Sequence, residues 1–149
     1  MSNTAAEAIE VGAMSVRFHV DADESAGSVS IFECYVPANA RMPAPHSHDD
    51  FDETVFGLDG VTTFTVGGAR TDLNPGEALF IPRRVIHGFS NGGDVDARFL
   101  AVISPGLLGS GYFPGYRRRP YWRWPAGRPN DRRSHAPARP DSRTTGLTG

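Results

Sequence analysis

The sequence of 149 residues contains no lysine, only one cysteine and no long apolar run. Cys34 has no partner within the chain, which excludes an intrachain disulfide and favours a reducing compartment. No apolar stretch approaches the ~20 residues that a membrane-spanning helix needs. The N-terminus also lacks the basic and apolar regions of a secretory signal. We therefore expect a cytoplasmic protein with no membrane partner.

Positive charge is scarce in most of the chain and concentrated at its end. Residues 1–116 contain six arginines and 15 acidic residues, a net charge of −9, whereas residues 117–149 contain nine arginines and two acidic residues, a net charge of +7. An acidic body offers no surface for nucleic acid, so we expect no nucleic-acid partner for it.

The basic end has neither strand nor helix periodicity and is rich in proline, so we expect residues 114–149 to form a disordered, irregular Arg/Pro-rich tail. Two other interpretations stay open. Trp122 and Trp124, interleaved with arginines, could stack on bases. Alternatively, a frame-shifted segment has replaced a native C-terminal helix.

Short β-branched and aromatic stretches, separated by Gly/Pro turns, make up the rest of the chain. This pattern, without any convincing amphipathic helix, predicts an all-β sandwich or barrel over residues 16–113, after a flexible N-terminal segment of residues 1–15. The expected strands are Val16–Val20, Ser28–Pro37, Val61–Val66, Arg70–Leu73, Ala78–Pro82 and Asp96–Ser104.

Three of the five histidines form a pattern with one glutamate. His46 and His48 are two residues apart, a spacing that points both imidazoles to one face of a strand. Glu53 needs a turn or bulge at Asp49–Asp52 to reach that face. His87 completes the set if its strand pairs back against the first.

Three neutral imidazoles and one carboxylate suit a single divalent transition metal, namely Fe, Mn, Ni, Co or Zn. Four protein ligands in an octahedral shell leave two positions for water, dioxygen or a chelating substrate. The simpler alternative is that His46 and His48 are solvent-exposed loop residues. We favour the metal site because four residues share the pattern.

The spacing of these residues resembles the two sequence motifs of the cupin superfamily, over about residues 28–105. The first motif is Gly, five residues, His-x-His, three or four residues, Glu, six residues and Gly. The second is Gly, five residues, Pro-x-Gly, two residues, His, three residues and Asn. Ala40 and Arg84 stand where the motifs have glycine. The matching residues are His46, His48, Glu53, Gly60, Gly76, Pro82, His87 and Asn91.

The resemblance is to small single-domain (monocupin), quercetin-dioxygenase-like bacterial proteins. It implies a double-stranded β-helix, the cupin jelly-roll barrel, with one metal held near its mouth by His46, His48, Glu53 and His87. It also implies a homodimer. Arg84 replaces a turn glycine, so the local geometry is expected to differ, and with Arg83 it places positive charge near the mouth.

The expected pocket is apolar and aromatic. If the strands are regular, parity places Met42 beside His46 and His48, and Phe89 beside His87. Five more aromatic residues lie on strands that could face inward. These are Phe32, Tyr35, Phe64, Phe80 and Phe99. Such a pocket favours a small aromatic or enolisable substrate of the flavonol, β-diketone or polyketide kind.

The leading hypothesis is a metal-dependent dioxygenase in which the substrate chelates the metal through two oxygens and Glu53 accepts its proton. One alternative is a non-oxidative cupin enzyme, that is, a polyketide cyclase, isomerase or decarboxylase. The other is a non-enzymatic barrel that binds a metal or a small molecule.

Overall fold

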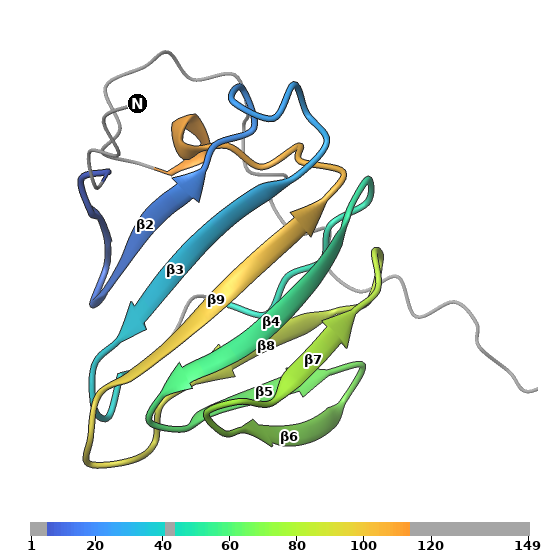
Figure 1. Cartoon of the computed structure of the whole chain (residues 1–149). Helices are drawn as coiled ribbons and strands as arrows, with labels where there is room; N and C mark the ends of the chain where they lie inside the picture. The colour runs from blue at the N-terminus through green and yellow to red at the C-terminus, as the bar shows by residue number, and fades with distance from the viewer. Residues whose placement is uncertain (1–5, 41–43, 114–149) are drawn as a thin grey trace, which may run out of the picture.

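The computed structural model describes residues 6–40 and 44–113, which fold as a jelly roll of two antiparallel sheets (Figure 1). Apart from the 3-10 turn η1 (Ser110–Tyr112), the regular structure of these residues is entirely β. The all-β jelly-roll prediction is confirmed. The strands are β1 (Ile9–Val11), β2 (Met14–Val20), β3 (Ser30–Val36), β4 (Asp52–Asp59), β5 (Thr62–Val66), β6 (Ala69–Leu73), β7 (Ala78–Ile81), β8 (His87–Ser90) and β9 (Ala97–Ser104).

The larger sheet has the strand order β1-β2-β3-β9-β4-β7, and the smaller sheet has the order β6-β5-β8. The chain crosses from the larger to the smaller sheet at Gly60, between β4 and β5. Gly60 has a φ of +59°, and a Cβ there would lie 2.3 Å from the carbonyl oxygen of Asp96. Only glycine fits such a left-handed turn against neighbouring backbone.

The core lies between the two sheets because side chains alternate along each strand. In β9 the residues at positions 97, 99, 101 and 103 are buried, and those between them are more exposed. Phe64 from the smaller sheet contacts Phe99 from the larger one, with ring centroids 5.2 Å apart. Apolar side chains from both sheets thus share one interior, which supplies most of the stabilisation of a fold of this size.

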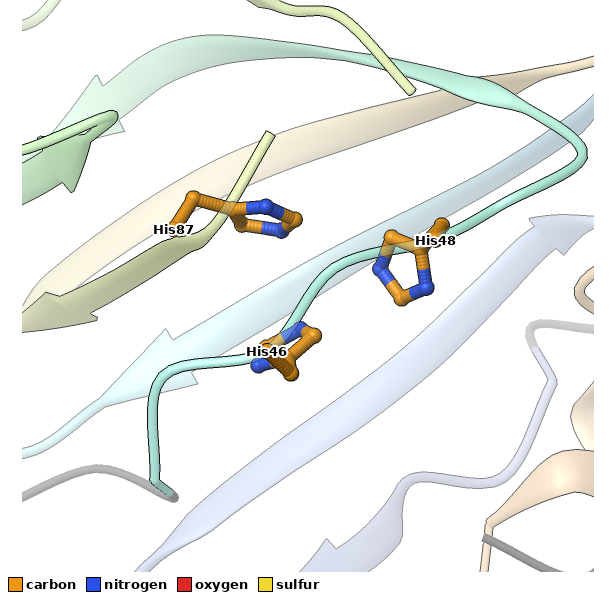
Figure 2. Close-up of side chains that lie close together, drawn as sticks. All are labelled: His46, His48 and His87. Atoms are coloured by element: carbon orange, nitrogen blue, oxygen red, sulfur yellow. The ribbon is translucent and has the colours of Figure 1, made fainter. Parts of the chain in front are cut away.

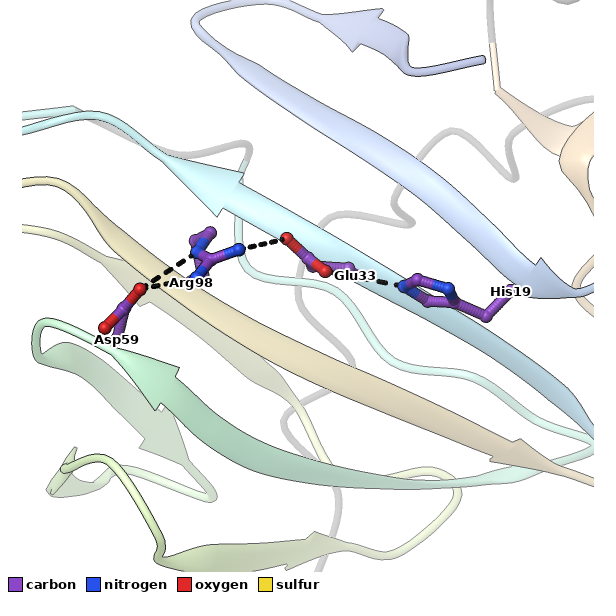
Figure 3. A network of polar contacts seen from close by, with 4 residues as sticks. All are labelled: His19, Glu33, Asp59 and Arg98. Carbon is purple, nitrogen blue, oxygen red and sulfur yellow. Dashed lines mark hydrogen bonds and ion pairs between the residues drawn. The ribbon is translucent and has the colours of Figure 1, made fainter. Parts of the chain in front are cut away.

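The outer face of the larger sheet carries a network of charged side chains (Figure 3). Arg98 on β9 bonds to Asp59 on β4 and, at 3.2 Å, to Glu33 on β3, which in turn lies 3.4 Å from the Nε2 of His19 on β2. His19, which lies in the strand expected over Val16–Val20, belongs to this outer network. Because these side chains are solvent-accessible, we expect the network to contribute little stability.

One boundary and one strand differ from the sequence-based expectation. Residues 9–15, expected to be part of a flexible N-terminal segment, form β1 and the start of β2, since Ile9 and Met14 are buried in the core. No strand was predicted for β4, because its acidic start, Asp52 and Glu53, hides its alternating pattern. The expected tail, residues 114–149, lies outside the described residues. Within the described part of the chain, no helix has the length and apolar character needed to cross a membrane.

Candidate metal centre

Three segments of the chain bring the predicted ligands together. His46 and His48 lie in the connection from β3 to β4, Glu53 is the second residue of β4, and His87 is the first residue of β8. His46 and His87 exchange backbone hydrogen bonds, with N···O distances of 2.9 and 2.8 Å. This single bridge adds the His46 segment to the edge of the smaller sheet, whereas the spacing argument for His46 and His48 assumed a strand there.

The three imidazoles face one another across a small space (Figure 2). One nitrogen from each ring lies within 4.8 Å of the others, so a single ion can be reached by all three rings. His46 and His48 are both half-buried, the side chain of His48 being 14% exposed, and the side chain of His87 is 3% exposed. The alternative of two solvent-exposed loop histidines is therefore not what the structure shows.

Glu53 joins the three rings from the larger sheet. Its Oε2 lies 3.3 Å from the Nε2 of His87 and 3.8 Å from the Nε2 of His48. The Nε2 of His87 is buried and makes no hydrogen bond. A buried polar atom without a hydrogen bond costs stability unless another ligand satisfies it. Three imidazole nitrogens and a carboxylate are donors that fit a divalent transition metal.

Backbone carbonyls fix the orientation of two of the rings. The Nδ1 of His87 lies 2.9 Å from the carbonyl oxygen of Val85, and the Nδ1 of His46 lies 3.3 Å from that of Ala44. With the proton on Nδ1, each ring donates to the carbonyl and presents the lone pair of Nε2 to the centre of the cluster. This arrangement is typical of metal-ligating histidines.

Burial and neighbouring charges shift the pKa values of these rings in different directions. Burial, followed by the neighbouring His87, lowers the pKa of His46, and burial lowers the pKa of His48 to about 4 despite the nearby Glu53 carboxylate. Burial also acts to lower the pKa of His87, but Glu53 and the Val85 carbonyl outweigh it, so the net shift is upward. His46 and His48 are therefore neutral at pH 7, the form that binds metals.

Some of the aromatic residues expected to line the pocket point into the barrel, and others do not. Phe89 packs against Phe64 and Phe99 with centroid distances of 5.4 and 5.0 Å. Phe64, on β5, is only 1% exposed and lies beside Phe89, its register partner on the neighbouring strand β8. Tyr35 and Phe80, expected to face inward, are 37% and 58% exposed on the outer face, because they alternate along β3 and β7 with the residues that face the core.

Phe32 and Phe99 are buried in the interior as expected. Met42, the third predicted pocket residue, lies outside the described residues. Phe51, which was not among the residues predicted from the sequence, stacks on His48 with ring centroids 4.3 Å apart. The available signal was an apolar ring in an otherwise acidic segment, Asp49–Asp52.

The two missing glycines of the motifs have different consequences. Ala40 does not have a left-handed backbone, so no glycine is needed there. Arg84 has a φ of +66°, a conformation that favours glycine, and its N–H donates to the carbonyl oxygen of His48 at 2.6 Å. Arg83 is held differently, by hydrogen bonds and an ion pair to Asp52.

Asn91, the last residue of the second motif, has a structural role that the sequence did not reveal. It is 1% exposed, its amide donates to the carbonyl oxygens of Val36 and Val95, and its Oδ1 accepts the N–H of Gly93. These bonds hold the loop from β8 to β9 against the end of β3.

Comparison with known proteins finds similarity to cupin domains over part of the chain. Residues 32–103 match the Cupin_2 family, described as a cupin domain. No curated protein matches the chain. The polyketide cyclase RemF from Streptomyces resistomycificus is 26% identical, with a TM-score of 0.59 over 74% of this chain and 86% of that one. A predicted oxalate decarboxylase from Thermotoga maritima is 20% identical, with a TM-score of 0.62 over 70% of this chain and 96% of that one.

Proposed function

We propose, on the basis of the match of residues 32–103 to a cupin domain, that the protein is an enzyme that binds one divalent transition metal. Its substrate in this proposal is an aromatic, enolisable small molecule. The observation that carries the metal assignment is the buried Nε2 of His87, which has no hydrogen bond and lies among two further imidazoles and a carboxylate. His46, His48, Glu53 and His87 would hold the ion. Once bound, the ion supplies Lewis acidity toward a chelating enol or enolate.

Glu53 is the residue to which we assign proton transfer. Its carboxylate faces the same space as the three imidazoles, and its side chain is 13% exposed. A carboxylate within reach of a bound enol can accept the enol proton. The Oε2 of Glu53 lies 3.3 Å from the Nε2 of His87, so the carboxylate and the ligand nitrogens share one space.

The apolar side of the site supports an aromatic substrate. Phe89 lies on the same face of β8 as His87 and extends the cluster toward Phe64 and Phe99. Aromatic side chains bind planar ligands by stacking and by excluding water. A free sugar, which needs many polar partners, fits such a wall less well.

Two reactions fit this site. Non-oxidative cyclisation of a polyketide-like substrate is favoured by the 26% identity to a polyketide cyclase, which extends over 74% of the chain. Oxygenation of a flavonol or β-diketone is favoured by the donor set, because four protein ligands of an octahedral ion leave two further positions. Both reactions begin with proton transfer from an enolisable carbon or hydroxyl, the step assigned to Glu53.

The metal assignment is tested by metal analysis of the purified protein. We expect about one equivalent of a transition metal in the wild type, its loss in His87→Ala, and no loss in His19→Ala, which removes a histidine from the outer network. A folded wild-type protein that binds no transition metal from a mixture of Mn, Fe, Co, Ni and Zn would overturn the proposal.

The reaction is tested on the metal-loaded protein with a flavonol, a β-diketone and a linear polyketide mimic. Turnover that consumes oxygen supports the dioxygenase, and turnover that proceeds equally without oxygen supports the cyclase. Glu53→Gln should abolish either activity. Absence of turnover with all three substrate classes counts against both reactions.

We propose that the binding partner of the site is its small-molecule substrate. We also propose that the protein assembles as a homodimer. Phe56 and Phe80 lie on the outer face of the larger sheet, 40% and 58% exposed, and support association of this face. Light scattering measures the mass directly, and a monomer at micromolar concentration would contradict the proposal.

A further inference from the structure

We propose that Phe51 is a positioning residue of the metal centre, which holds the imidazole of His48 in its metal-binding orientation through ring stacking. This inference rests on the proposed metal site. Phe51 does not itself offer a metal ligand, so it acts through His48.

The stacking geometry is close. The ring centroids of Phe51 and His48 are 4.3 Å apart, and the ring planes are inclined by 26°. Phe51 is only 9% exposed and belongs to the hydrophobic core. A ring that is packed into the core has little rotational freedom, so it presents a fixed flat surface to the imidazole.

His48 needs such support more than the other two histidines do. The rings of His46 and His87 are oriented by the carbonyl oxygens of Ala44 and Val85. No hydrogen bond orients the ring of His48 within residues 6–40 and 44–113, and its closest charged neighbour is Glu53 at 3.8 Å. Stacking on Phe51 therefore takes the place of the hydrogen bond that orients the other two rings.

Phe51 also connects two ligands of the site. It immediately precedes β4, whose second residue is Glu53, and it contacts His48 on the preceding loop. A shift of the Phe51 ring would change the placement of His48 relative to Glu53. Outer residues that orient metal ligands typically contribute about 10- to 100-fold to metal affinity.

The test measures cobalt binding to the full-length protein by visible absorption, with dissociation constants from competition with a chelator. Phe51→Leu removes the flat ring but keeps an apolar side chain, and we expect at least a tenfold weaker affinity and an altered cobalt spectrum. Phe51→Tyr keeps the ring and should restore both. The matched control is Phe18→Leu, a buried phenylalanine that pairs with Phe32 rather than with a ligand.

A double-mutant cycle distinguishes positioning from general destabilisation. In a His48→Ala background, Phe51→Leu should cause no further loss of affinity, because the ring that it orients is gone. An equal loss in both backgrounds, or unchanged cobalt affinity and spectrum in folded Phe51→Leu, overturns the inference. If Phe51→Leu does not fold, Phe51→Met replaces it under the same criteria. Failure of the wild type to bind cobalt would instead refute the proposed metal site.

Discussion

Arg84 occupies a turn that favours glycine, so replacing it with glycine should stabilise the protein. Its φ of +66° costs a residue with a Cβ about 1–2 kcal/mol. Replacing Arg84 with glycine removes this cost. Glycine also raises the conformational entropy of the unfolded chain, which destabilises the folded protein by about 0.4–1 kcal/mol. The net stabilisation expected for Arg84→Gly is therefore about 0.5–1 kcal/mol, or about 2–5 °C in melting temperature for a domain of this size.

Two comparisons isolate the backbone from the charge. Arg84→Ala removes the same guanidinium but keeps a Cβ at the strained position, so it should be less stable than Arg84→Gly. Gly76 provides the reverse change. It has a φ of +86° and open space around its Cα, so Gly76→Ala should destabilise by about the amount that Arg84→Gly stabilises.

The assay is urea unfolding followed by circular dichroism, together with thermal melting. Arg84→Gly keeps the N–H that donates to His48, so we expect its metal affinity to be unchanged. Equal stabilisation by alanine and glycine at position 84 would show that charge, not backbone conformation, is the cause. A less stable Arg84→Gly would refute the argument altogether.

Two further predictions concern single titratable groups. Cys34 is 3% exposed, and burial, followed by the charges of Glu53 and Glu33, raises the pKa of its thiol. We therefore expect no reaction of the native protein with a thiol reagent. The same reagent should titrate one thiol after the protein is unfolded. The hydroxyl of Tyr35 donates to Asp96 at 2.6 Å, a bond that raises the pKa of the tyrosine and lowers that of the carboxyl. The stability linked to the tyrosine is thus present below about pH 10 and lost above it, and that linked to Asp96 is present above about pH 4 and lost on acidification. In Asp96→Asn the ultraviolet titration of Tyr35, assigned by difference from Tyr35→Phe, should shift toward lower pH. An unchanged titration curve would count against this hydrogen bond.

Local patterning was enough to predict most of the barrel. Alternating apolar residues and Gly/Pro turns gave the strands over residues 28–37, 61–66 and 96–104 close to their observed bounds. The spacing of the three histidines and Glu53 also predicted four metal ligands, which the structure brings together. The strands are visible in a sequence because periodicity depends on near neighbours along the chain, and the ligand set is visible because its residue types and spacing match two sequence motifs.

The outward direction of Tyr35 and Phe80, the stacking of Phe51 on His48 and the left-handed turn at Arg84 could not be predicted in the same way. Each depends on which residues from distant segments meet, such as the exchange of hydrogen bonds between His46 and His87. The sequence by itself determined the all-β character and the candidate ligands, because strand periodicity and residue chemistry are local. Only the tertiary structure decided how the ligands are oriented and buried, because the two sheets bring together residues that are far apart in the chain.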